Sequence, residues 1–178
     1  MYSINFDKYF ELINWSCVYW GIREQLIEPE NAVIYADKII ENNPNDDTPE
    51  IIELLIIDKA YKNDVLTLIE KMFPVKKDLD TKKTSALRTL RLILLLEIKN
   101  NIIDNQNLLN EIENIYADFD YPTDMEGFIS YMPNQDTEYD VSKHSHQENM
   151  QHLVDKFNIF IDKEFNTVTT LNNITIQK

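Results

Sequence analysis

Four closely spaced carboxylates are the side chains of this chain best suited to chemistry or binding. They follow the pattern Asp-x-Asp-x-x-x-Asp-x-Glu and are Asp118, Asp120, Asp124 and Glu126. Carboxylate oxygens are ligands that Ca²⁺ prefers, and similar spacings occur in calcium loops. Counted from Asp118, however, position 6 is Thr123 where an EF-hand needs Gly, and position 12 is Ile129 where it needs Glu. We therefore expect no metal site here and interpret the acids as a docking surface, with a solvated loop as the structural alternative.

Aromatic side chains alternate with these acids, and no basic residue interrupts them. Between Lys99 and Lys143 the chain has no Lys, Arg or His, but it has ten Asp and Glu residues. Aromatic side chains bury a large area at a small cost in entropy, so Tyr121 and Tyr131 are the predicted anchors. The predicted partner-binding residues are Asp118, Asp120, Tyr121, Asp124, Glu126 and Tyr131. This combination indicates a protein partner with a basic surface.

Other residue types that carry catalysis or metal binding do not form a motif. His144 and His146 would point about 200° apart on a helix, which favours a solvated helix start over a metal site. Cys17 lies in an apolar run, and the next basic residue along the chain is Arg23, so a buried, inert thiol is expected. We predict no catalytic residue, no metal and no cofactor. The alternative is a metal-dependent hydrolase that uses the carboxylates from Asp118 to Glu126.

Composition excludes several classes of function. The chain has 178 residues, a formal net charge of -14 and 43% hydrophobic residues. The excess negative charge disfavours nucleic acid and anionic membranes as partners, because their phosphates would be repelled. With only two glycines, Gly21 and Gly127, a P-loop, a dinucleotide fingerprint or a GxSxG elbow cannot be built. The start of the chain lacks the pattern of a signal peptide, so a cytoplasmic location is expected.

The hydrophobic pattern is typical of an all-α protein. Apolar residues recur at helical spacing, and Asn, Thr and Pro stand where helices would begin. The predicted helices cover residues 15–27, 29–41, a segment from 49, 63–73, 84–99, 105–117 and 145–165. We expect one domain over residues 1–178, with antiparallel helical hairpins packed as a bundle or a short irregular array. Residues 167–177, rich in Thr and Ile, would form a short β-hairpin or a frayed tail.

Two segments resemble a known bacterial family. Residues 114–133 read NIYADFDYPTDMEGFISYMP, and residues 14–16 and 19–21 read NWS and YWG. These stretches resemble the DUF2247 family, a family of unknown function, and the resemblance covers most of the chain. It implies no activity or site residues. By analogy with other small acidic bacterial families, we interpret the chain as an immunity-type or inhibitor protein that neutralises a basic partner such as a toxin. A nuclease with a positive groove would suit it, and a helical scaffold protein is a further alternative.

Overall fold

The described part of the chain is helical throughout. The computed structural model describes residues 1–72, 79–134 and 136–171. Within them every regular element is a helix, and Tyr2 and Ile27 form an isolated parallel bridge. The predicted all-α class is confirmed, whereas the arrangement as antiparallel hairpins is not supported. The chain forms two compact units, Met1–Leu90 and Arg91–Thr170. The single domain predicted from the length stays a prediction.

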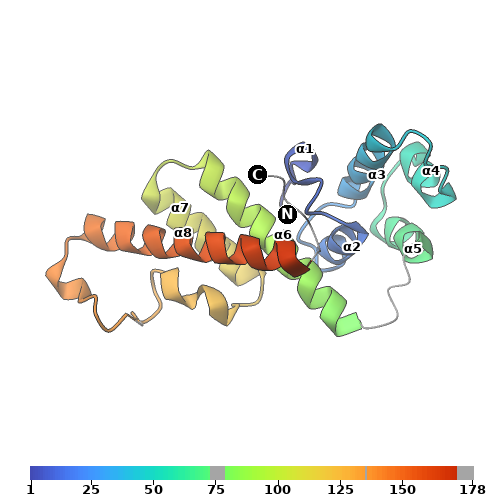
Figure 1. Ribbon diagram of the computed structural model, residues 1–178. Helices are drawn as coiled ribbons and strands as arrows, with labels where there is room; N and C mark the ends of the chain where they lie inside the picture. The colour runs from blue at the N-terminus through green and yellow to red at the C-terminus, as the bar shows by residue number, and fades with distance from the viewer. Residues whose placement is uncertain (73–78, 135, 172–178) are drawn as a thin grey trace. The chain divides into compact units, whose positions relative to one another are not determined.

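The first unit contains five helices that lie before residue 73, together with the first part of a sixth (Figure 1). They are α1 Phe6–Tyr9, α2 Trp15–Arg23, α3 Glu30–Asn42, α4 Pro49–Ile56, α5 Lys62–Met72 and α6 Leu79–Asn101. Helix α3 packs against α4, and α5 packs against both α2 and α4. The sixth helix, α6, crosses the boundary between the two units at Leu90 and Arg91.

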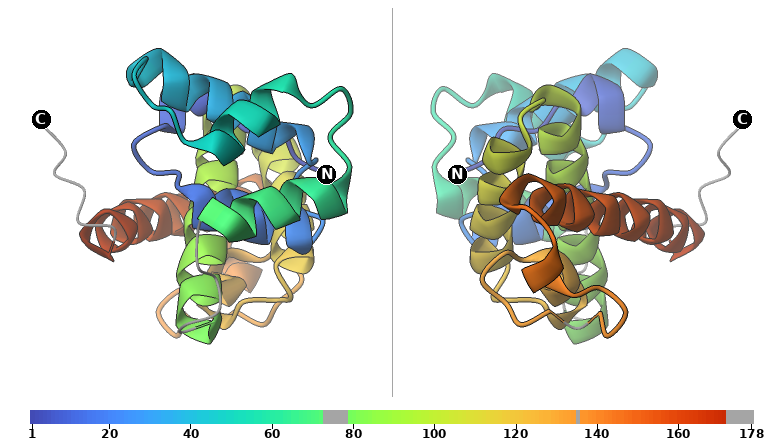
Figure 2. Two further views of the ribbon diagram at one scale, coloured as in Figure 1. Left: turned by 90° about the vertical axis from the view of Figure 1, so that its right-hand side faces the viewer. Right: turned by 90° about the vertical axis from the view of Figure 1, so that its left-hand side faces the viewer.

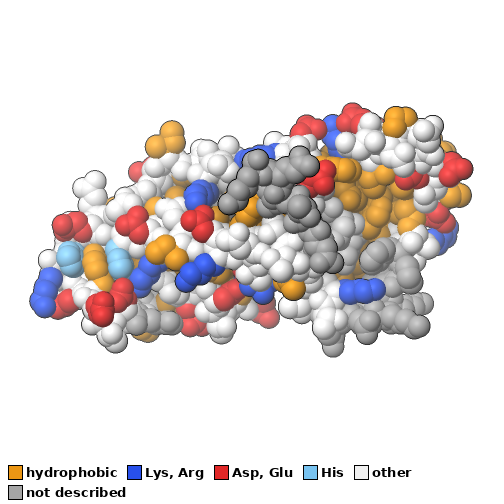
Figure 3. Space-filling view, viewed as in Figure 1, with side chains coloured by type: hydrophobic (Ala, Val, Ile, Leu, Met, Phe, Trp, Pro, Cys, Tyr) orange, Lys and Arg blue, Asp and Glu red, His pale blue; other side chains and the backbone are white. Residues whose placement is uncertain are grey.

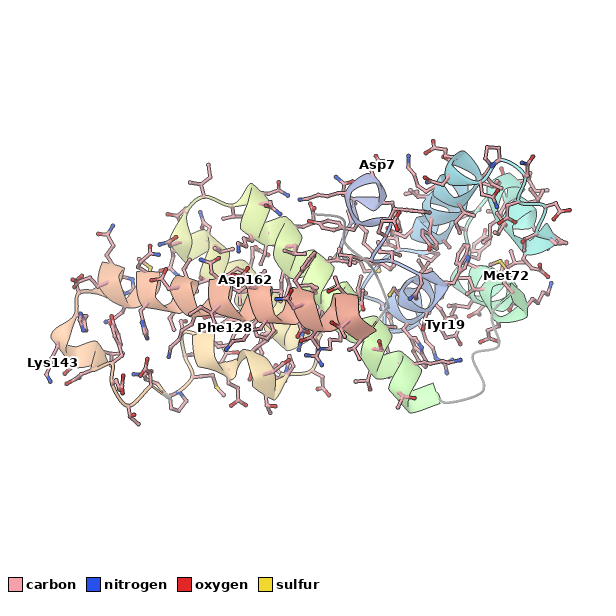
Figure 4. The ribbon with its side chains drawn as sticks, in the orientation of Figure 1. Asp7, Tyr19, Met72, Phe128, Lys143 and Asp162 are labelled. Carbon is pink, nitrogen blue, oxygen red and sulfur yellow. The ribbon has the colours of Figure 1, made fainter. Side chains whose placement is uncertain are left out.

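Helix α2 carries much of the core of the first unit. Its N-terminus is capped as predicted, because the Asn14 side chain accepts a hydrogen bond from the Cys17 backbone N–H at 3.1 Å. Its residues from 17 to 22 are buried, and both tryptophans of the chain lie on it. The Tyr19 hydroxyl donates to Glu70 of α5 at 2.5 Å and accepts from Arg23 at 2.5 Å (Figure 4). The hydrogen bond to Glu70 joins α2 to α5 at the edge of the core.

Gly21 permits a close approach inside the first unit. A Cβ atom at this position would lie 2.9 Å from Ile27 and 3.0 Å from Leu90, which is closer than ordinary van der Waals contact. Leu90 belongs to the apolar stripe of α6 and is fully buried. The glycine is therefore required by packing against its neighbours.

The first residues of α3 and α4 lie at or next to the positions predicted from the sequence. Pro49 is the first residue of α4, as expected from its fixed φ. Thr48 precedes it, but its side chain makes no capping hydrogen bond; its backbone N–H instead bonds the Asp46 carboxylate at 3.0 Å. Pro29, predicted as the first helical residue, is the N-cap, and α3 begins at Glu30. These differences amount to one residue or one hydrogen bond.

The second unit begins with Arg91 in α6 and includes two short 3₁₀ helices (Figure 2). The elements that follow α6 are α7 Asn105–Asp118, η1 Thr123–Phe128, η2 Val141–Lys143 and α8 His146–Leu171. The buried face of α7 includes Leu109, Ile112 and Ile115. That of α8 includes Phe157 and Ile161. The elements η1 and η2 lie in the acidic, proline-containing segment, where the sequence pattern predicted no helix.

The C-terminal β-hairpin prediction is wrong for the described residues. Helix α8 continues to Leu171, so residues 167–171 are helical, and residues 172–177 lie outside the described residues. The threonines there donate hydrogen bonds to carbonyls in the preceding turn: Thr167 to Lys163 at 2.9 Å and Thr170 to Asn166 at 2.8 Å. Such bonds satisfy the hydroxyl within a helix. With Val168 buried, packing overrides the β propensity of this stretch.

Candidate functional site

The acidic and aromatic segment begins at a sharp turn that ends α7. The backbone N–H of Phe119 bonds the Ile115 carbonyl at 3.0 Å, and that of Tyr121 bonds the Tyr116 carbonyl at 3.0 Å. Asp120 and Tyr121 have φ values of 62° and 55°. The left-handed region costs non-glycine residues about 1–2 kcal/mol, less for Asp than for Tyr. The hydrogen bonds therefore hold a strained turn, with Tyr121 at its tip.

Beyond the turn, η1 is anchored by apolar side chains. Met125 and Phe128 are buried, and the Met125 backbone N–H bonds the Pro122 carbonyl at 2.9 Å. The Phe128 ring lies 5.6 Å from that of Phe157 and 5.0 Å from that of Phe160, both on α8 (Figure 4). The segment is therefore fixed against α8, while the side chains of Thr123 and Asp124 stay exposed.

The structure brings the two predicted anchors together on a third tyrosine. Tyr116 on α7 is 2% exposed, and its ring lies 5.3 Å from Tyr121 at an interplanar angle of 82°. Tyr131 lies 6.5 Å from the same ring at 56°. Tyr121 and Tyr131 are 57% and 60% exposed. We call these three residues the tyrosine cluster: one buried ring that supports two exposed ones.

Carboxylates lie near the tyrosine cluster. Burial raises the pKa of Tyr116, and the Glu126 carboxylate raises it further. Partial burial raises the pKa of Tyr131, and Glu113 acts in the same direction. Glu113 is held in place because its Oε1 accepts from the Ser130 backbone N–H at 3.1 Å and from the Ser130 hydroxyl. The phenols of Tyr116 and Tyr131 are therefore neutral at neutral pH, in a negative electrostatic environment.

The four predicted docking acids do not share one environment. Asp118 and Asp120 are exposed, and Glu126 is half-buried. Asp124 forms an ion pair with Arg91: Nη1–Oδ1 is 2.8 Å and Nη2–Oδ2 is 2.6 Å. Its carboxylate is thus engaged within the protein, and the docking role predicted for it stays a prediction.

Arg91 is a buried cation that sequence reasoning missed. Its side chain is 7% exposed, its Nη2 lies 3.2 Å from Oε1 of the buried Glu164 on α8, and its guanidinium lies 5.7 Å from the centre of the Phe160 ring. Because Asp124 is on η1, the arginine ties α6, η1 and α8 together. The sequence did contain an indication of this role, because Arg91 interrupts its most apolar stretch and a buried arginine needs acidic partners.

A second aromatic arrangement lies in the loop before α8. The Tyr139 ring stacks between His144, at 4.4 Å and 7°, and His152, at 3.6 Å and 5°. Figure 3 shows pale-blue histidine side chains at the left of the surface. Its hydroxyl donates to Asn149 Oδ1 at 2.9 Å. The His152 Nε2 atom lies 3.5 Å from the Asp136 carboxylate. Two of the three histidines therefore pack on one tyrosine, which sequence spacing did not predict.

A cavity of about 280 Å³ lies between this loop and η1. Glu126, Asn134, Tyr139, Asn149 and His152 are among the residues that line it. Its amides are engaged in the fold: the Asn134 side chain donates to the Tyr139 carbonyl at 2.7 Å, and Asn149 donates to the Val141 carbonyl at 3.1 Å. These bonds shape the loop, so the polar lining is largely structural.

Comparison with known proteins places the chain in a family. The family described as "Uncharacterized protein conserved in bacteria (DUF2247)" matches residues 4–165. The chain belongs to the DUF2247 family. The match spans the helices from α1 to α7 and most of α8, so both units of this DUF2247 chain lie within the family. No curated protein and no solved structure matches the chain.

In residues 1–72, 79–134 and 136–171, no group of three His, Cys, Asp or Glu side chains is placed to hold a metal ion. Burial raises the pKa of the Cys17 thiol to about 11, which keeps it protonated and unreactive. Within the same described ranges, no helix is both long and apolar enough to span a membrane.

Proposed function

We propose that this DUF2247 protein works by binding another protein, as an immunity-type or inhibitor protein that neutralises a basic partner such as a bacterial toxin. The docking surface is the tyrosine cluster with Asp118, Asp120, Glu113 and Glu126 around it. The observation that carries this proposal is the pair of exposed rings, Tyr121 and Tyr131, fixed on one buried ring within an acidic segment.

The two kinds of side chain would contribute differently to binding. Interface energy is concentrated in a few aromatic anchors, and charges at the rim mainly raise the association rate and set specificity. Tyr121 and Tyr131 fit the first role because their backbone is already ordered, so little entropy is lost on binding. Asp118 and Asp120 fit the second role because they are exposed. The net charge of -14 adds a long-range attraction for a basic partner.

A nuclease is the kind of toxin that matches this surface best. Its nucleic-acid groove must be positive to bind phosphates, and an acidic protein that covers the groove blocks it by charge and by shape. The alternative of a metal-dependent hydrolase has less support, because Asp124, one of the carboxylates it would use, is paired with Arg91.

Affinity capture with the tagged, full-length chain from bacterial lysate tests the proposal, and mass spectrometry identifies the partner. Association and dissociation rates are then measured at two ionic strengths. The surface variant carries Asp118→Asn, Asp120→Asn and Glu126→Gln, and leaves Asp124 in place because it is structural. We expect this variant to associate about tenfold more slowly or worse, with a weaker dependence on salt.

A matched control changes net charge by the same amount at a different place. The variant Asp37→Asn, Glu53→Gln and Asp58→Asn removes three exposed acids of the first unit. Equal effects of the two triple variants would show that only total charge matters and would reject the surface. If capture recovers no basic protein, the proposed function itself is rejected.

A further inference from the structure

We propose that the tyrosine cluster receives one arginine side chain of the partner protein: its guanidinium stacks on the exposed rings of Tyr121 and Tyr131, and Glu113 balances its charge. This inference rests on the proposed function, since it names the chemical group that the docking surface recognises.

The rings are presented in a way that suits a planar cation. Tyr116 meets Tyr121 edge-on and Tyr131 at a tilt, so the two exposed rings are supported from below and keep more than half of their surface in water. The turn at Asp120 and Tyr121 fixes the position of the first ring at a cost in backbone strain. Strain of this kind is retained where the surrounding structure over-determines the conformation, and such residues cluster at binding sites.

The charges around the rings favour a cation. The Glu113 carboxylate is held by Ser130, the residue before Tyr131. The faces of aromatic rings are themselves negative and attract cations within about 6 Å. The Glu113 carboxylate and the exposed rings therefore supply the two kinds of group that bind a guanidinium.

Tyr61, which is as exposed as Tyr121, already carries a cation of its own. Lys59 lies 4.9 Å from the centre of the Tyr61 ring. Among the residues that the structure describes, no Lys or Arg lies over Tyr121 or Tyr131. Between Lys99 and Lys143 the sequence has no Lys or Arg. These two rings are thus left for a cation from another molecule.

The chemistry selects arginine over lysine. A guanidinium is flat, stacks on an aromatic face and directs several N–H donors toward a carboxylate at its edge. An ammonium is a compact, strongly hydrated charge that cannot stack in this way. A flat cation can therefore contact Tyr121 or Tyr131 with its face and Glu113 with its edge at the same time.

The test uses acetyl-arginine-amide as a probe of the full-length protein, followed by nuclear magnetic resonance of the tyrosine rings. Acetyl-lysine-amide and acetyl-citrulline-amide, which lacks the charge but keeps the shape, are the comparisons. We expect the arginine probe to shift the signals of Tyr121 and Tyr131 and to bind at least two- to fivefold more tightly than either comparison. Tyr121→Leu and Tyr131→Leu should each weaken its binding about two- to fivefold. Tyr61→Leu, at a ring of equal exposure that already has Lys59 over it, should leave binding unchanged.

Failure of the inference can be told apart from failure of the proposed function. Citrulline or lysine binding as tight as arginine binding, or shifts elsewhere only, would overturn the arginine site. The arginine site would also be overturned if a captured partner dissociated at an unchanged rate from Tyr121→Leu and from Tyr131→Leu. If the same partner associated more slowly with the triple acid variant, the proposed function would still stand. Dissociation that speeds up in both tyrosine variants, with correct folding shown by far-ultraviolet circular dichroism, would support it.

Discussion

Replacement of Arg91 by methionine should destabilise the second unit strongly. The change removes the guanidinium and keeps an apolar side chain of similar length, so Glu164, which is 3% exposed, loses its ion pair with Arg91 at 3.2 Å. Removing one member of a buried ion pair costs about 3–5 kcal/mol of unfolding free energy. Asp124 adds little to this cost, because at 44% exposure it can regain water. We therefore expect a loss of about 3–5 kcal/mol.

Two further variants show where this free energy arises. Asp124→Asn keeps Arg91 and Glu164 together but weakens two charge-assisted hydrogen bonds at the surface, so we expect a loss of about 1–2 kcal/mol. Asp120→Asn is the matched control, because it removes an exposed acid from the same segment and Asn tolerates a positive φ. It should change stability by less than about 0.5 kcal/mol.

Urea unfolding, combined with hydrogen exchange of peptides from α8, measures these effects. Linear extrapolation gives the unfolding free energy, and exchange shows that the loss lies in the second unit. The double variant Arg91→Met, Glu164→Leu should recover much of the stability, since a buried ion pair can be replaced by apolar groups at little cost. Equal stability of Arg91→Met and Asp120→Asn would refute the reasoning, because the buried network would then contribute nothing.

Three other predictions concern packing, thiol reactivity and pH. Gly21→Ala should cost about 1–3 kcal/mol in urea unfolding, because the new Cβ would lie within 3.0 Å of its neighbours; Gly127→Ala, with no atom within 4 Å, should cost less than about 0.5 kcal/mol. With its pKa raised to about 11 by burial, Cys17 should react with a disulfide reagent at pH 8 only as fast as the protein opens, and rapid labelling of the folded protein would contradict this. Hydrogen bonds from Ser145 lower the pKa of Glu148 below its usual 4.5, so unfolding free energy should fall as the pH drops below 4.5, and Glu148→Gln should flatten part of that fall.

The sequence predicted those features that depend on residues close together in the chain. The Asn14 cap, the Pro49 helix start and the wide apolar stripe of α6 follow from local patterns, and they are present. Tyr121 and Tyr131 were predicted as a pair because the same acidic segment contains both. That both rings rest on Tyr116 follows from the turn at the end of α7, which no glycine marks in the sequence.

Features that join distant segments could not be predicted in the same way. Arg91 lies 33 residues from Asp124 and 73 from Glu164. Its place in an apolar stretch indicates that it needs an acid, but 31 Asp and Glu residues are candidates. For the same reason, sequence reasoning gave the four acids of the segment one role. Only the three-dimensional structure shows that Asp124 is paired with Arg91.

Because both tryptophans lie on α2, tryptophan fluorescence is an intrinsic probe of the first unit. Selective excitation of indole reports on the first unit alone, because the second has tyrosines but no tryptophan. The urea concentration at which indole emission changes can be compared with the concentration at which α8 loses amide protection. Different concentrations would show that the units unfold in separate steps. In binding experiments the same emission serves as an internal reference, and a tryptophan placed at Phe157 would supply the missing signal from the second unit.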